Sequence, residues 1–246
     1  MVHGAWFGGW VWDQVAQALR SKGHVVHAPS LTGLGDKQHL SRRGINLTTH
    51  ADDIVELIER EQLNEVVLVG WSYGGMVTSE VLARIPARIG AMVYLDAFVP
   101  ERGRSVVDYT SALTASESST AEQKTEATSY TETVEDLEPA SFDIMGVTDP
   151  SIIDHAAPRL CRHPIGTFMQ PSNALLERPS HIPHVYILAG ASPTAALFRP
   201  VMERVAQEPC FRTETLDTSH LMMLTAPAEI VRILAACETA APKARD

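Results

Sequence analysis

The sequence has few cysteines and no long apolar run. Three cysteines among 246 residues, without Cys-x-x-Cys spacing, predict neither a disulfide framework nor a zinc site and favour a reducing compartment. No apolar run approaches the roughly 18 residues that a membrane span requires. The N-terminus shows neither the basic nor the apolar segment of a signal peptide. We therefore expect a cytoplasmic protein.

Basic side chains are also scarce. Lys and Arg number 20 against 30 Asp and Glu, which gives a net charge of -10. Binding to phosphates needs clustered Lys and Arg, so nucleic acids and anionic membrane surfaces are not expected as partners. A hydrophobic content of 45% with only 20% charged residues excludes a disordered chain and is enough for one good-sized core.

Short β-rich runs alternate with helix-like stretches along most of the chain. Strands are predicted at residues 25–28, 65–70, 91–95, 184–189 and 211–216. Helices are predicted at residues 51–61, 75–84, 200–207 and 227–237. Alternating strands and helices indicate an α/β fold, a mainly parallel sheet with helices on both faces.

One long stretch interrupts this alternation. Residues 100–183 contain no strong strand and several X-Pro pairs. So long an interruption within a compact α/β chain is typical of an inserted helical cap over an active site, although an ordinary surface excursion remains an alternative. The predicted organisation is a core of residues 1–99 and 184–246 with a cap of residues 100–183.

A nucleophile is predicted at Ser72. Residues 70–74 have the sequence GWSYG, which matches Gly-x-Ser-x-Gly and lies between a predicted buried strand and a predicted helix. This strand–turn–helix context is that of a nucleophile elbow, in which a strained turn exposes the serine hydroxyl at the edge of the sheet. The alternative is a glycine-rich turn with an incidental serine.

The start of the chain resembles an oxyanion-hole loop. Residues 3–6 have the sequence HGAW. A His-Gly pair after an early strand is typical of the oxyanion-hole loop in proteins that have a nucleophile elbow. We assign the two backbone N–H donors to Ala5 and to Tyr73, the residue after the nucleophile. Each donor is typically worth about 10²–10³ in rate. His3 is expected to hold the loop by hydrogen bonds from its ring.

The general base is predicted to be His220. A serine hydroxyl needs a base with a pKa near 7, which is the property of histidine. Chain order in this fold places that base after the last strand, and His220 follows the predicted strand 211–216 with no histidine beyond it.

The third member of the triad is less obvious. The loop at residues 190–196 contains no carboxylate, although the acid commonly follows that strand. Asp96 ends the predicted strand next to the nucleophile strand, and neighbouring parallel strands end at the same edge of a sheet. We therefore predict Asp96 as the acid that orients His220.

Other arrangements remain open at this point. Asp96 could instead bond the loop at residues 99–100, and Ser192 or a water molecule could complete a dyad. Asp217 and Glu203 are weaker candidates, because Asp217 is too close to His220 in sequence and Glu203 lies on a predicted helix face.

Several motifs together resemble one family. They are HGAW, LTGLG, GWSYG, YLDAFVP and HLM at residues 3–6, 31–35, 70–74, 94–100 and 220–222. They resemble the α/β-hydrolase superfamily, in particular the bacterial EstC-like and pyrethroid-hydrolase-like esterases. These are similar in turn to plant salicylate methyl-esterases and hydroxynitrile lyases. The resemblance implies an α/β-hydrolase fold with a small cap, no cofactor, and small esters as substrates.

Two positions separate esterases from lyases within that resemblance. The related hydroxynitrile lyases carry Lys directly after the catalytic His and Thr in place of the Gly of the His-Gly pair. Here Leu221 and Gly4 stand at those positions, which favours an esterase. The strand that normally precedes the His-Gly pair is represented only by Met1 and Val2.

The predicted function is therefore that of a serine carboxylesterase acting through an acyl-enzyme intermediate, with neither metal nor cofactor and a small-molecule ester as partner. An amide or carbamate hydrolase with the same residues, a lyase, and a non-catalytic ligand receptor are the alternatives, and a homodimer is left open. Four apolar side chains are expected to line the substrate pocket: Trp6, Phe98, Phe168 and Leu221.

Overall fold

The computed structural model describes residues 1–115, 136–174 and 178–238. Its centre is a parallel sheet of four strands in the order β1-β2-β3-β4. These strands are β1 (Val66–Trp71), β2 (Ile89–Leu95), β3 (His184–Ala189) and β4 (Phe211–Leu216). Val2 adds a single parallel bridge to Gly70 at the edge of β1. The predicted α/β class is confirmed.

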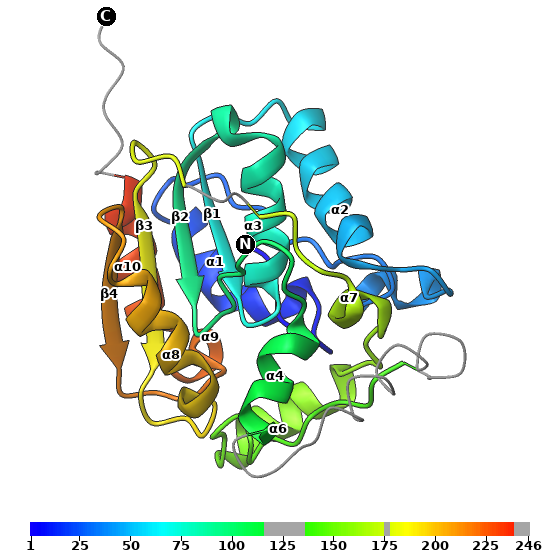
Figure 1. Ribbon diagram of the computed structural model, residues 1–246. Helices are drawn as coiled ribbons and strands as arrows, with labels where there is room; N and C mark the ends of the chain where they lie inside the picture. Colours follow the sequence, from blue (N-terminus) through cyan, green and yellow to red (C-terminus); the bar gives the residue numbers. More distant parts are fainter. Residues whose placement is uncertain (116–135, 175–177, 239–246) are drawn as a thin grey trace, which may run out of the picture.

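Helices surround this sheet (Figure 1). Six have eight or more residues in the described parts of the chain: α1 (Asp13–Arg20), α2 (Leu47–Arg60), α3 (Gly74–Arg84), α4 (Val106–Ala115), α8 (Ala195–Val205) and α10 (Pro227–Glu238). Shorter helical segments are α6 (Pro150–Ala156), α7 (Gly166–Met169), α9 (Met222–Thr225), η1 (Gly9–Trp12), η2 (Gly35–Leu40), η3 (Pro86–Arg88) and η5 (Ala157–Arg159). None of the helices in these parts is long and apolar enough to cross a membrane.

Both faces of the central strands β2 and β3 are buried, and the side chains of each strand alternate between the two faces. Along β2, Met92 and Tyr94 pack with helices α2, α3 and α8, whereas Val93 and Leu95 pack with α1 and α10. Strands β1, β2 and β3 therefore consist almost entirely of apolar residues, as expected for parallel strands covered on two sides. The edge strand β4, with the sequence FRTETL, is partly exposed. Helices α1 and α10 lie behind the sheet in Figure 1, and α3 and α8 lie in front of it.

Most predicted elements are present, with shifted ends. The strands at residues 184–189 and 211–216 have the predicted bounds. Helix α2 begins at Leu47, four residues before the predicted start, because the Asn46 side chain caps the helix by accepting from the Thr49 amide. Helix α8 begins at Ala195 and not at Pro200, which lies inside it. Helix α1 was not predicted.

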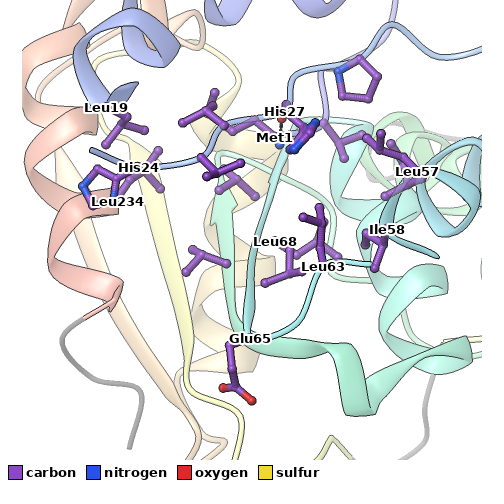
Figure 2. A pocket seen from close by; sticks show the side chains of 18 of the residues that line it. Met1, Leu19, His24, His27, Leu57, Ile58, Leu63, Glu65, Leu68 and Leu234 are labelled. Carbon is purple, nitrogen blue, oxygen red and sulfur yellow. Dashed lines mark hydrogen bonds between the residues drawn. The ribbon is translucent and has the colours of Figure 1, made fainter. Parts of the chain in front are cut away.

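The predicted strand at residues 25–28 is wrong. The backbone there forms no strand, and Val25 is 81% exposed. A groove of about 380 Å³ separates residues 24–27 from β1 (Figure 2), with apolar side chains such as Leu57, Ile58 and Leu68 along it. A strand requires a paired neighbour, and this segment forms no bridge to the chain start. The Met1 amino group donates a hydrogen bond to His27 O at 2.8 Å.

Between β2 and β3 the described residues contain four helical segments joined by loops and turns. They form α4, α6, η5 and α7, together with one isolated antiparallel bridge between Leu137 and His163. Helices α4 and α6 lie beyond the carboxyl ends of the strands in Figure 1. Residues 116–135 and 175–177 of the predicted cap lie outside the described residues.

Candidate active site

Ser72 lies in a tight turn between β1 and α3. Its φ of +54° is in the left-handed region, which costs a non-glycine residue about 1–3 kcal/mol. The turn is held by three backbone hydrogen bonds: Ser72 N–H donates to Leu95 O at 3.2 Å, and Ser72 O accepts from Gly75 and Phe98 at 3.1 and 3.2 Å. A Cβ on Gly74 would lie 2.6 Å from Val2 O, so only glycine fits there. The geometry is that of the predicted elbow.

Asp96 leaves the sheet beside Ser72. Trp71 and Leu95 are register partners at the ends of β1 and β2, so the next residue of each strand emerges at the same edge. Asp96 also has a positive φ, +42°, and its side chain is fully buried. Its amide donates to Ile187 O at 2.7 Å, which ties the turn to β3 as well.

The carboxylate of Asp96 has three hydrogen-bond donors. Oδ2 accepts from His220 Nδ1 at 2.6 Å and from Thr194 Oγ1 at 2.8 Å, and Oδ1 accepts from the Ala189 amide at 3.0 Å. A buried carboxylate needs such partners, because an unpaired buried charge is strongly unfavourable. Both oxygens are therefore fixed in position.

His220 lies between β4 and α9 and is 5% exposed. Because a carboxylate only accepts hydrogen bonds, Nδ1 carries the proton in the neutral ring and Nε2 keeps its lone pair, as a general base requires. The backbone of His220 is anchored through its N–H to Met145 O at 2.9 Å and through its O to Trp71 Nε1 at 2.8 Å. Its ring stacks on Phe198, with centroids 5.5 Å apart.

The predicted oxyanion-hole residues belong to two segments that lie next to Ser72. A Cβ on Gly4 would lie 2.9 Å from Ser72 Cβ, so the loop that carries Ala5 passes directly beside the nucleophile. Tyr73 directly precedes the first residue of α3. At the start of a helix the backbone N–H groups have no partner within the helix. A helix N-terminus also favours developing negative charge.

The oxyanion loop is fixed by His3. The ring Nδ1–H donates to Gly4 O at 2.8 Å, and Nε2 accepts from the Leu31 amide at 3.0 Å. Burial lowers the pKa of His3 from 6.5 to about 4, so the ring stays neutral at pH 7 and keeps both bonds.

The four predicted pocket residues lie in different surroundings. Trp6 and Phe168 are half-buried and meet edge to face with centroids 6.1 Å apart. Phe98 is 4% exposed and packs on Phe198. Leu221 is fully buried in the same apolar cluster as Trp71.

Sequence reasoning missed Thr194 as a partner of the predicted acid. Thr194 belongs to the loop after β3 that has no carboxylate, and its hydroxyl reaches across to Asp96. Ser192, in the same loop, donates to Met145 O at 3.2 Å, the carbonyl that also accepts from the His220 amide. The sequence did contain a sign of this contact, because the loop after β3, where an acid was expected, carries the hydroxyls of Ser192 and Thr194. In the described parts of the chain, no group of three or more His, Cys, Asp or Glu could hold a metal ion.

A parallel α/β sheet with a strained serine at the end of one strand, and a His–Asp pair beside it, has the architecture of an α/β hydrolase. The model of the Alpha/beta hydrolase family matches residues 1–233. The chain belongs to this family, as the motifs indicated.

Individual relatives agree with this assignment. The carbendazim hydrolyzing esterase of Nocardioides sp. (strain SG-4G) is 51% identical over 107 residues, 44% of each chain. Methylesterase 10 of Arabidopsis thaliana is 36% identical over 101 residues, 40% of this chain and 36% of that one. The matched stretches thus span less than half of these curated relatives. A crystal structure of the pyrethroid hydrolase PytH aligns over 97% of this chain and 95% of its own with a TM-score of 0.71; at 19% identity it shows the shared fold.

Proposed function

We propose that this protein is a serine carboxylesterase in which Ser72, His220 and Asp96 form the catalytic triad. The observation that carries the proposal is the 2.6 Å contact between His220 Nδ1 and Asp96 Oδ2 at the sheet edge where Ser72 occupies its strained turn. Two relatives named as esterases support the same reaction class.

The residues supply each step of an acyl-enzyme mechanism. His220 Nε2 takes the proton of the Ser72 hydroxyl while its oxygen attacks the ester carbonyl carbon. The Ala5 and Tyr73 amides bind the oxyanion. The carbon–oxygen bond to the alcohol then breaks, and His220 returns the proton to the departing alcohol. Water, activated by the same nitrogen, releases the acid and restores Ser72.

Asp96 has two functions in this scheme. It holds the ring of His220 in the tautomer whose Nε2 is free, and its charge stabilises the imidazolium that forms in the transition state. Its other donors, Thr194 and the Ala189 amide, keep the carboxylate from rotating away. A dyad completed by Ser192 is disfavoured, because the Ser192 hydroxyl donates to Met145 O.

Residues 100–183 are proposed as the cap over this site, with Trp6 and Phe168 among the apolar side chains that receive the substrate. Trp6 bonds the cap segment directly: its Nε1 donates to Leu137 O at 3.2 Å, and its carbonyl accepts from the Cys161 amide at 3.0 Å. A cytoplasmic location stays a prediction, which the three unpaired thiols support. A homodimer also stays a prediction.

A carbamate hydrolase is the second candidate. The Nocardioides relative is named for hydrolysing carbendazim, a carbamate, and carbamate cleavage would use the same nucleophile, base and oxyanion donors. A lyase is disfavoured, because the position after His220 is occupied by Leu221, fully buried among apolar side chains.

The test is a panel of p-nitrophenyl esters with short, long and aromatic acyl groups, run beside carbendazim on the wild type and on Ser72→Ala. We expect Ser72-dependent hydrolysis of at least one small ester and labelling of Ser72 by a fluorophosphonate. Faster turnover of carbendazim than of every ester would favour the carbamate hydrolase. Absence of both turnover and labelling would favour a ligand receptor.

A further inference from the structure

Trp6, the residue after the oxyanion donor Ala5, has an unfavourable backbone conformation. Its φ is +68°, in the left-handed region that tryptophan rarely adopts. Residues in such conformations persist only where surrounding contacts hold them. The contacts that hold Trp6 come from a segment more than 130 residues away in sequence.

Three of those contacts involve Trp6 backbone or ring atoms. The Trp6 amide donates to His163 Nδ1 at 3.4 Å, the Cys161 amide donates to Trp6 O at 3.0 Å, and Trp6 Nε1 donates to Leu137 O at 3.2 Å. The Trp6 amide is therefore engaged by His163, next to the Ala5 amide that is assigned as the first oxyanion donor. His163 acts through its ring, and the Cys161 thiol also donates to Trp6 O at 3.5 Å. Leu137 acts through its backbone carbonyl.

The ring of His163 is itself fixed. Its Nε2–H donates to Thr167 Oγ1 at 2.7 Å, and that hydroxyl donates to Pro164 O at 2.8 Å. The His163 backbone exchanges two hydrogen bonds with Leu137, of 2.8 and 2.9 Å. The tautomer that satisfies these bonds leaves the Nδ1 lone pair for the Trp6 amide.

His163 also stays neutral. It is fully buried, and burial, with the nearby rings of His50 and His3, holds its pKa well below 6.5. The lone pair that accepts from Trp6 is therefore available throughout the neutral pH range.

The same ring contacts the other side of the oxyanion hole. His163 meets the ring of Tyr73 edge to face at 4.9 Å between centroids, and it packs on Phe168 at 4.9 Å. The two amides assigned to the oxyanion belong to Ala5 and Tyr73. The His163 side chain thus accepts a hydrogen bond from Trp6, which follows the donor Ala5, and packs on the ring of the donor Tyr73.

We propose that His163 is a positioning residue for the oxyanion hole: through the Trp6 amide and the Tyr73 ring it sets the spacing of the Ala5 and Tyr73 N–H groups. This inference rests on the proposed function. Oxyanion donors act in the transition state only when they are preorganised at the position that the charged oxygen will occupy. A shift of either donor therefore lowers kcat while ground-state binding changes little.

The test compares His163→Phe, which keeps a ring but removes the acceptor, with His163→Asn, whose Oδ1 can lie near the position of Nδ1. For His163→Phe we expect kcat to fall about 10- to 100-fold, less than for complete loss of one donor, with KM within threefold of wild type. Affinity for an aryl boronic acid, a tetrahedral mimic, should fall by a similar factor. His163→Asn should recover at least part of both losses.

Two controls separate positioning from folding. His184→Phe replaces another buried histidine whose pKa burial lowers to about 4, in β3, and should leave kcat unchanged. The pH profile of kcat should keep its midpoint in His163→Phe, because His220 and Asp96 are untouched. If His163→Phe does not fold by circular dichroism, Thr167→Val, which removes only the partner of Nε2, should lower kcat about two- to tenfold.

Wild-type kcat and boronic acid affinity in a folded His163→Phe would overturn the proposal, as would equal losses in His163→Phe and His184→Phe. A shifted midpoint of the pH profile would also overturn it. The wild type and Ser72→Ala decide the proposed function separately: a wild type that hydrolyses esters only when Ser72 is present upholds that function whatever the His163 variants show.

Discussion

Asp96 Oδ2 lies 2.6 Å from His220 Nδ1 although the two residues are 124 positions apart. Asp96 follows β2, the direct neighbour of the nucleophile strand β1, and not β3, where the loop carries Ser192 and Thr194. The same carboxylate oxygen accepts from Thr194 Oγ1. The loop after β3 thus contributes a hydroxyl that binds the acid.

Asp96→Asn should lower kcat by about 10⁴-fold, because an amide no longer selects the tautomer with a free Nε2 nor stabilises the imidazolium. Steady-state kinetics on the best ester of the panel measures this. Asp217→Asn is the matched control, since Asp217 is exposed and close to His220 in sequence. Near-normal turnover in Asp96→Asn would remove Asp96 from the triad.

Ser72→Ala should lower kcat by about 10⁶-fold if the triad acts as a unit. Ser72→Gly should be equally inactive but more stable, by about 1 kcal/mol, because glycine adopts the φ of +54° without the strain of a side chain. Urea denaturation of the two variants measures the difference. A Ser72→Gly protein less stable than Ser72→Ala would contradict stored strain at this turn.

Thr194→Val should lower the free energy of unfolding by about 1.5–3 kcal/mol, since it removes a partly buried hydrogen bond to a carboxylate. It should also lower kcat roughly tenfold, which corresponds to about 1.4 kcal/mol of transition-state stabilisation. Thr194→Ser keeps the hydroxyl and should stay within twofold of wild type. If Val and Ser variants lose activity equally, the hydroxyl is not what matters at this position.

The protein should lose stability as the pH falls below about 6.5. Burial lowers the pKa of both His3 and His50 from 6.5 to about 4, so between these values the unfolded chain binds protons that the folded chain does not. Each histidine then lowers the free energy of unfolding by up to about 1.4 kcal/mol per pH unit, and the loss levels off near pH 4. Above pH 6.5 neither histidine contributes.

Urea midpoints at pH 7.5 and 5.0 measure this dependence. His50→Gln should show a smaller difference between the two pH values, whereas His39→Gln, at an exposed position, should match wild type. A wild-type midpoint that does not change between pH 7.5 and 5.0 would argue against buried neutral histidines.

The local sequence pattern predicted those elements that can be recognised from neighbouring residues alone. The strands at residues 184–189 and 211–216 have the predicted bounds, because β-rich runs of that length between turn-forming residues suit a strand. The first lies in the buried interior of the sheet and the second at its partly exposed edge. The elbow at Ser72 was also readable, since its glycines and its strand–helix context are adjacent in sequence. Local pattern failed at residues 25–28, which have strand-like composition but no paired neighbour along most of their length.

The sequence by itself therefore determined the fold class and the family, and it predicted the positions of the candidate nucleophile and the candidate base. Only the tertiary structure decided which partners surround Asp96 and which residues between β2 and β3 hold Trp6. The physical reason is the range of the interactions. Helix and strand periodicity is a property of neighbouring residues, whereas the hydrogen bonds from Thr194 to Asp96 and from Trp6 to His163 join positions 98 and 157 residues apart. Such pairs meet only after the sheet has brought distant segments to one edge.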